Sequence, residues 1–172
     1  AANKLYGVLE MASLSYGYAI TTYVGQNLGA KKYRRIRNGV RSGVYMALIT
    51  SIVISGVMVI TGRNILSLFV SGEAGQVKQV LDIAYKYLFI MAIFLWVLYL
   101  LYVYRSAIQG LGNTLIPLAS GVVEFCMRVG VALLLPKLIG EDGIFYAEIS
   151  AWSGAAILLI VSYVVIIRKY KE

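Results

Sequence analysis

Residues 24–41 read VGQNLGAKKYRRIRNGVR, and apolar sequence flanks this stretch on both sides. It holds six of the sixteen lysines and arginines of the chain and no acidic residue. A basic cluster between two hydrophobic segments is typical of the cytoplasmic side of a membrane protein. A nucleic-acid patch is the alternative, but uncharged runs of about 20 residues do not surround such patches. We therefore expect a membrane protein in which residues 31–41 form a cytoplasmic loop.

The composition supports a membrane protein and excludes several classes of enzyme. Hydrophobic residues make up 60% of the 172 residues and charged residues 14%, with a net charge of +8. Soluble domains carry about 25% charged residues. There is no histidine, and the single cysteine, Cys126, lies in an apolar run, which leaves no Cys/His zinc site and no Cys–His or Ser–His nucleophile. We expect no enzymatic activity, no metal, no cofactor and no nucleic-acid partner.

Five segments are predicted to cross the bilayer as helices, because about 20 apolar helical residues span the 30 Å hydrocarbon core. The expected fold class is an all-α integral membrane protein, a multi-pass helical bundle. The chain does not begin with Met, and an odd number of crossings with residues 31–41 inside puts residue 1 outside. We therefore expect the C-terminal part of a longer protein. The predicted spans are residues 5–30, 43–62, 87–104, 118–135 and 143–167.

Small residues recur every fourth position in three of these segments, and such faces allow close helix packing in lipid. Segment 87–104 has no such face and is rich in aromatic residues, so we expect its middle to face lipid or a large cavity. Residues 77–88 have helical apolar spacing and predict an amphipathic helix at the outer surface that leads into this span. The small-residue positions are Ser13, Gly17, Thr21, Gly25 and Gly29; Gly43, Ala47, Ser51 and Ser55; and Ala147, Ala151 and Ala155.

Charged residues inside the predicted spans are candidate functional groups, because a charge at mid-membrane costs about 2.5 kcal/mol or more. Glu124 and Arg128 are four residues apart in the favourable helical order, which predicts a pair on one helix face. This pair is either a structural clamp or a site where Glu124 exchanges a proton. Glu148 and Glu10 lie near the outer ends of their helices, where water reaches them. Arg105 is expected to extend to the inner interface.

Gln26 and Asn27 lie where the first helix is expected to end. Their amides either gate the cytoplasmic opening or satisfy backbone groups at the helix terminus. The sequence pattern favours the second interpretation, since Gly29 follows directly.

Three stretches resemble the multidrug and toxic compound extrusion (MATE) family of transporters, in the order in which they occur in that family. VGQNLGAKKYRRIRNGV is similar to a cytoplasmic loop of its C-terminal half. Residues 104–129, YRSAIQGLGNTLIPLASGVVEFCMRV, resemble a second signature of that half. Residues 143–152, GIFYAEISAW, resemble the start of the last helix.

The resemblance implies a partial C-terminal lobe of a two-lobe secondary transporter, comprising its last five helices. Such plasma-membrane proteins exchange small organic, often cationic, compounds for Na⁺ or H⁺ by alternating access, so the C-terminus would be cytoplasmic and the bilayer and the missing N-terminal lobe would be the partners. Coupling sites in the family draw on acids of the first lobe and of the helix before residue 1. Segment 87–104 lacks the acid that some sodium-coupled relatives carry there. The coupling ion, Na⁺ or H⁺, therefore stays open.

Two other functions fit parts of the sequence. A flippase for lipid-linked oligosaccharides belongs to the same superfamily, but its cavity should hold more cations within the membrane than this chain offers. A structural bundle that transports nothing would explain the Glu124–Arg128 pair alone. The two long family signatures favour the antiporter.

Overall fold

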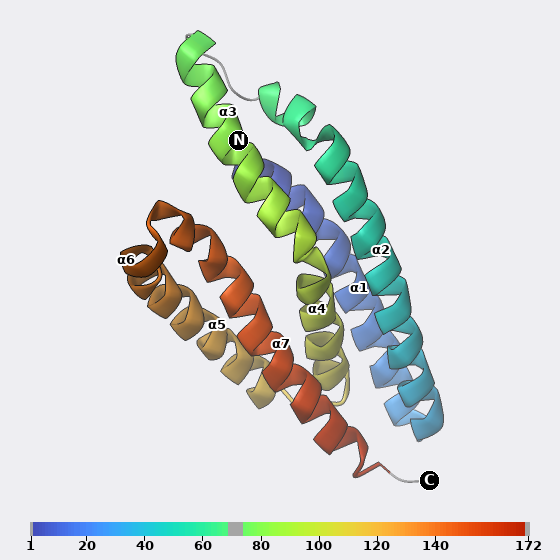
Figure 1. Cartoon of the computed structure of the whole chain (residues 1–172). Coiled ribbons are helices and arrows are strands. Elements are labelled where there is room, and N and C mark those ends of the chain that lie inside the picture. The colour runs from blue at the N-terminus through green and yellow to red at the C-terminus, as the bar shows by residue number, and fades with distance from the viewer. Residues whose placement is uncertain (1, 69–73, 171–172) are drawn as a thin grey trace.

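The computed structural model describes residues 2–68 and 74–170, and every regular element in these ranges is helical (Figure 1). This confirms the predicted all-α bundle. The elements are α1 (Ala2–Gly29), α2 (Tyr33–Ser67), α3 (Ala74–Ile93), α4 (Leu95–Gly110), α5 (Leu115–Leu134), α6 (Pro136–Ile139), a 3₁₀ turn at Glu141–Ile144, and α7 (Phe145–Ile167).

Three helical segments of the described chain are long and apolar enough to cross a membrane: Tyr33–Ser67, Leu115–Ile139 and Phe145–Ile167. Val77–Ile93 and Leu95–Gly110 make a fourth crossing if this bent pair is one broken span. Helix α1 has 28 residues, which is sufficient length, but it is not apolar enough to meet the same criterion. The fifth crossing, predicted at residues 5–30, therefore stays a prediction.

The basic stretch is mostly helix and not the loop that the sequence predicted. Helix α1 ends in a Schellman motif, in which Lys31 and Lys32 donate backbone hydrogen bonds to Leu28 and Asn27 at 2.9 Å each. Lys31, and not Gly29, takes the left-handed conformation, with φ of 56°. Helix α2 then begins at Tyr33 and carries four of the six cations: Arg34, Arg35, Arg37 and Arg41.

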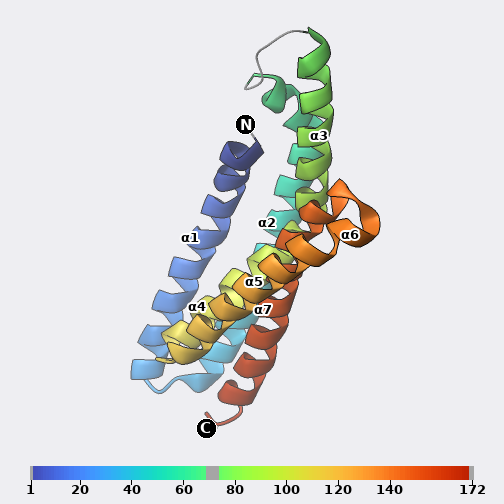
Figure 2. The same ribbon diagram turned by 90° about the vertical axis from the view of Figure 1, so that its left-hand side faces the viewer.

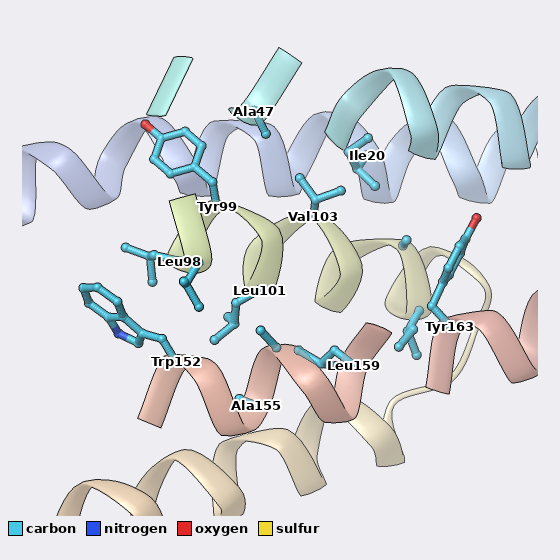
Figure 3. Close-up of a cluster of buried hydrophobic side chains, with 14 of the residues drawn as sticks. Ile20, Ala47, Leu98, Tyr99, Leu101, Val103, Trp152, Ala155, Leu159 and Tyr163 are labelled. Atoms are coloured by element: carbon cyan, nitrogen blue, oxygen red, sulfur yellow. The ribbon is translucent and has the colours of Figure 1, made fainter. Parts of the chain in front are cut away.

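Helix α4 forms the centre of the bundle, so the expectation that this segment faces lipid or a cavity is wrong. Figure 3 shows Tyr99 and Val103 turned toward α1 and α2, while Leu98 and Leu101 turn toward α7. All four are at most 2% exposed. A helix that is apolar on every side is buried. Hydropathy alone did not distinguish this environment from lipid.

Helices α3 and α4 meet at a bend of 49° near Phe94. The Ser55 hydroxyl of α2 donates a hydrogen bond of 2.6 Å to the carbonyl of Ala92, just before the bend. A side chain that binds a helix carbonyl is a recognised cause of kinks. Helix α3 runs alongside α2, where Tyr85 donates to the Val59 carbonyl at 2.8 Å. Helix α3 therefore packs on α2 and leads into α4 through the bend, and its predicted place at the outer membrane surface stays a prediction.

The predicted small-residue faces form contacts between helices over part of their length, but Gly25 and Gly29 of the first face are exposed. A β-carbon on Gly17 would lie 2.9 Å from the Ser106 hydroxyl of α4. One on Gly110 would lie 2.7 Å from the β-carbon of Val24. On α7, Ala151 and Ala155 are fully buried. Small residues therefore let α1 and α4 approach closely, Gly17 of α1 at Ser106 and Gly110 of α4 at Val24.

Replacement of Gly17 by leucine should force α1 away from α4. Overpacking of this kind costs about 1–3 kcal/mol, so unfolding of the complete protein in detergent should occur at a clearly lower temperature. Gly56→Leu is the matched control, because nothing lies within 4 Å of the position that its β-carbon would take. Equal thermal stability of the two variants would contradict the close approach of α1 and α4.

Candidate functional site

The mostly buried glutamate of α5 forms an ion pair with an arginine of α4. Glu124 lies midway along α5, and its carboxylate Oε1 accepts a hydrogen bond and ion pair from Arg105 Nη2. The same nitrogen donates to the hydroxyl of Ser120 at 3.1 Å. Both charged side chains are about four-fifths buried, at 21% and 19% exposed. Arg105 therefore points into the bundle, and its predicted extension to the inner interface is wrong.

A second ion pair connects α5 to α7. Arg128 Nη2 lies 2.8 Å from Glu148 Oε2, with the side chains 46% and 27% exposed. Glu148, expected to be hydrated near the outer side, thus has a charged partner within the bundle.

The predicted Glu124–Arg128 pair is replaced by these two pairs between helices. Residues four apart on a helix differ by about 40° around its axis. Glu124 therefore reaches α4, while Arg128 reaches α7. The i,i+4 spacing correctly placed both charges on one side of α5, but it could not show which neighbouring helices supply the opposite charges.

A third polar contact, missed by the sequence reasoning, joins α1 to α4. The Tyr102 hydroxyl donates a hydrogen bond of 2.7 Å to Glu10 Oε1. Glu10 is only partly exposed and has a partner 92 residues away, so it does not simply reach water. In the sequence, Tyr102 lies one helical turn before Arg105. This spacing indicates that α4 has a polar side, but it does not show which residues of other helices that side contacts.

We call these three separate contacts together the polar relay, which comprises Glu10, Tyr102, Arg105, Glu124, Arg128 and Glu148. It crosses four helices in the spatial order α1, α4, α5 and α7. Tyr102 and Arg105 belong to one face of α4, and Glu124 and Arg128 to one side of α5. A change of charge at Glu124 would therefore alter the attraction between α4 and α5 directly.

The two amides near the end of α1 have separate environments. Asn27 is buried, and its amide nitrogen donates to the Tyr23 carbonyl at 2.8 Å. The Tyr23 carbonyl lies inside α1 and is not one of the free carbonyls of its last turn, so the role of Asn27 in satisfying the helix terminus stays a prediction. Gln26 is exposed on the other side of α1. The structure does not bring Gln26 into the polar relay, and its role as a gate stays a prediction.

Comparison with known proteins identifies the family. The sequence model described as MatE matches residues 1–134, from the start of the chain to the end of α5. The chain belongs to the MATE family. The resemblance found in the sequence motifs is thus confirmed, and membership of a transporter family supports a function other than catalysis.

One relative is named for drug resistance. The "Probable multidrug resistance protein YoeA" of Bacillus subtilis (strain 168) is 25% identical over 147 residues. The alignment covers 86% of this chain but 27% of the relative. The chain thus spans about a quarter of the length of this relative.

Double-mutant cycles test which charges of the MATE chain are paired. Arg105→Gln should cost about 2–3 kcal/mol, because it strands Glu124 in a low dielectric, and Arg105→Gln with Glu124→Gln should cost less. The coupling energy should be about 1 kcal/mol or more for Arg105–Glu124. Equilibrium unfolding of the complete protein in mixed micelles measures these differences.

The cycle for Glu124 and Arg128 is the matched control. We expect a coupling energy below about 0.5 kcal/mol there, since each has a different partner. Strong coupling for Glu124–Arg128 together with additive effects for Arg105–Glu124 would contradict the pairing.

Proposed function

We propose that this chain is part of a cation-coupled efflux antiporter that exports small organic, mainly cationic, compounds by alternating access. It would contribute five helices to the C-terminal lobe, and an N-terminal lobe of the same protein would complete the cavity. The observation that carries the proposal is the polar relay in a MATE chain. It joins four helices of one lobe through charges that an ion or proton could alter.

The proposed orientation places the basic end in the cytoplasm of a plasma-membrane protein. The α1–α2 turn and the C-terminal end of α7 lie at one end of the bundle, and the beginnings of α1 and α3 lie at the other (Figure 2). The first end holds Lys31, Lys32, Arg168 and Lys169. An excess of cations marks the cytoplasmic side. The chain termini themselves, residues 1 and 171–172, lie outside the described residues.

Glu124 is the proposed coupling residue of this chain. Its carboxylate pairs with Arg105, which also donates to the Ser120 hydroxyl, and Tyr102 lies close by on α4. When Glu124 binds H⁺ or Na⁺, its attraction for Arg105 falls, and α5 with α7 becomes free to shift against α4. Glu148 and Arg128 would keep α5 and α7 together during that shift.

The alternatives explain the interior charges less well. A flippase cavity for lipid-linked oligosaccharides should present cations to a phosphate-bearing substrate. Here Arg105 and Arg128 are each neutralised by a glutamate from a neighbouring helix. A bundle that transports nothing would use the pairs only for stability. It would not require transport to depend on Glu124.

The test uses the complete protein reconstituted in liposomes with an imposed Na⁺ or H⁺ gradient. Export of a fluorescent organic cation should require one of these gradients and stop when an ionophore collapses it. Arg105→Gln with Glu124→Gln should retain the folded protein but reduce gradient-driven export about tenfold or more. Arg128→Gln with Glu148→Gln is the matched control and should reduce it less.

Two outcomes would contradict the proposal. Export that survives collapse of both gradients and follows ATP would exclude a secondary antiporter. Unchanged gradient dependence in the Arg105/Glu124 double variant would remove Glu124 from coupling.

A further inference from the structure

A cavity of about 300 Å³ lies at the basic end of the bundle, apart from the polar relay. Helix α2 supplies Arg37 and Arg41 to its lining, α4 supplies Tyr104, and α7 supplies Tyr163. Every charged residue that lines it is an arginine. The cavity is therefore built to receive an anion.

Tyr163 provides an unused hydrogen-bonding group in this cavity. Its side chain is 7% exposed, yet its hydroxyl has no hydrogen-bond partner among the described residues. Figure 3 shows the ring extending from α7 with its hydroxyl toward the side where α1 and α2 lie. A buried hydroxyl without a partner destabilises the fold, and a bound oxygen acceptor would satisfy it.

The two arginines keep donors available for such an acceptor. Arg37 donates one hydrogen bond of 2.8 Å to the Tyr170 carbonyl. Arg41 makes a long contact of 3.4 Å with the Tyr45 hydroxyl and lies over its ring. A guanidinium has five N–H donors in a planar arrangement that matches phosphate oxygens. Both side chains are exposed at the mouth of the cavity, one helical turn apart.

The surroundings distinguish a lipid from a soluble anion. Val40 and Val44 line the cavity between the arginine positions and the bundle interior. From there, exposed apolar side chains continue along both flanking helices: Ile49, Val53 and Val57 on α2, and Val164, Val161 and Ile157 on α7. Acyl chains would lie along these faces while the phosphate occupies the cavity. Basic pockets between helices on the cytoplasmic side are known to bind anionic headgroups.

We propose that the cavity between α2, α4 and α7 binds the phosphodiester headgroup of an anionic phospholipid from the cytoplasmic leaflet. Arg37 and Arg41 hold the phosphate, and Tyr163 donates to one of its oxygens. The bound lipid fastens α2 to α7 across α4 at this end of the lobe. The site is independent of the transported compound.

The experiment measures thermal unfolding of the delipidated complete protein in neutral detergent. Phosphatidylglycerol should raise the unfolding temperature by several degrees more than phosphatidylcholine does. Arg37→Gln with Arg41→Gln should lose at least two-thirds of that difference, and Tyr163→Phe a smaller part. Lys31→Gln with Lys32→Gln is the matched control, since it removes equal charge from the same end but outside the cavity, and it should keep the full difference.

Three results would overturn the site. Equal losses in the two double variants would mean that phosphatidylglycerol acts through general attraction to a basic surface. A stabilisation by soluble glycerol phosphate as large as that by phosphatidylglycerol would assign the cavity to a free phosphate compound. No difference between the two lipids in the unsubstituted protein would exclude selectivity for an anionic headgroup, and with it the proposed site. The unfolding temperature of every variant is also measured with phosphatidylcholine. A general loss of stability is thereby separated from a loss of the response to phosphatidylglycerol.

Discussion

The burial of α4 between α1, α2 and α7 is the constraint on which the rest of the bundle depends. Its bulky side chains lie between α1 and α2 on one side and α7 on the other (Figure 3). Lipid is as apolar as leucine, so close packing and not the hydrophobic effect must hold the helices together. Small residues permit that packing at the contact with α1, where Gly17 lies against Ser106 and Gly110 of α4 lies against Val24. These positions therefore set how closely α1 and α4 approach.

The polar relay depends on this arrangement. Because α4 lies between α1 and α5, it brings Tyr102 to Glu10 and Arg105 to Glu124. Each charge in the interior thereby has a partner on another helix, which offsets part of the cost of its burial. The same contacts make the relay responsive, since neutralising one carboxylate changes the attraction between two helices. A MATE lobe that must change its packing during transport would have a use for such a contact.

The sequence predicted the helical class, the family and the small-residue faces, because each has a local pattern. It did not predict the position of α4, since an aromatic-rich apolar run has the same composition in a protein core and in lipid. It misassigned Arg105 because α4 continues five residues beyond it to Gly110, so a cation that looked terminal lies inside. The partners of Glu124 and Arg128 depend on which helices flank α5. Which helices are neighbours is a property of the tertiary structure, and residue spacing within one helix does not determine it.

A disulfide between α1 and α4 tests the central position of α4 most directly. A β-carbon on Gly17 would lie 4.0 Å from that of Ser106, within the 3.5–4.5 Å typical of disulfides. Gly17→Cys with Ser106→Cys, in a Cys126→Ala background, should therefore cross-link under mild oxidation in the membrane. A protease site between α2 and α3 allows detection, because only cross-linked fragments remain together without reductant. Gly17→Cys with Gly121→Cys should stay separate, and cross-linking of that control pair but not of the Gly17–Ser106 pair would contradict the arrangement.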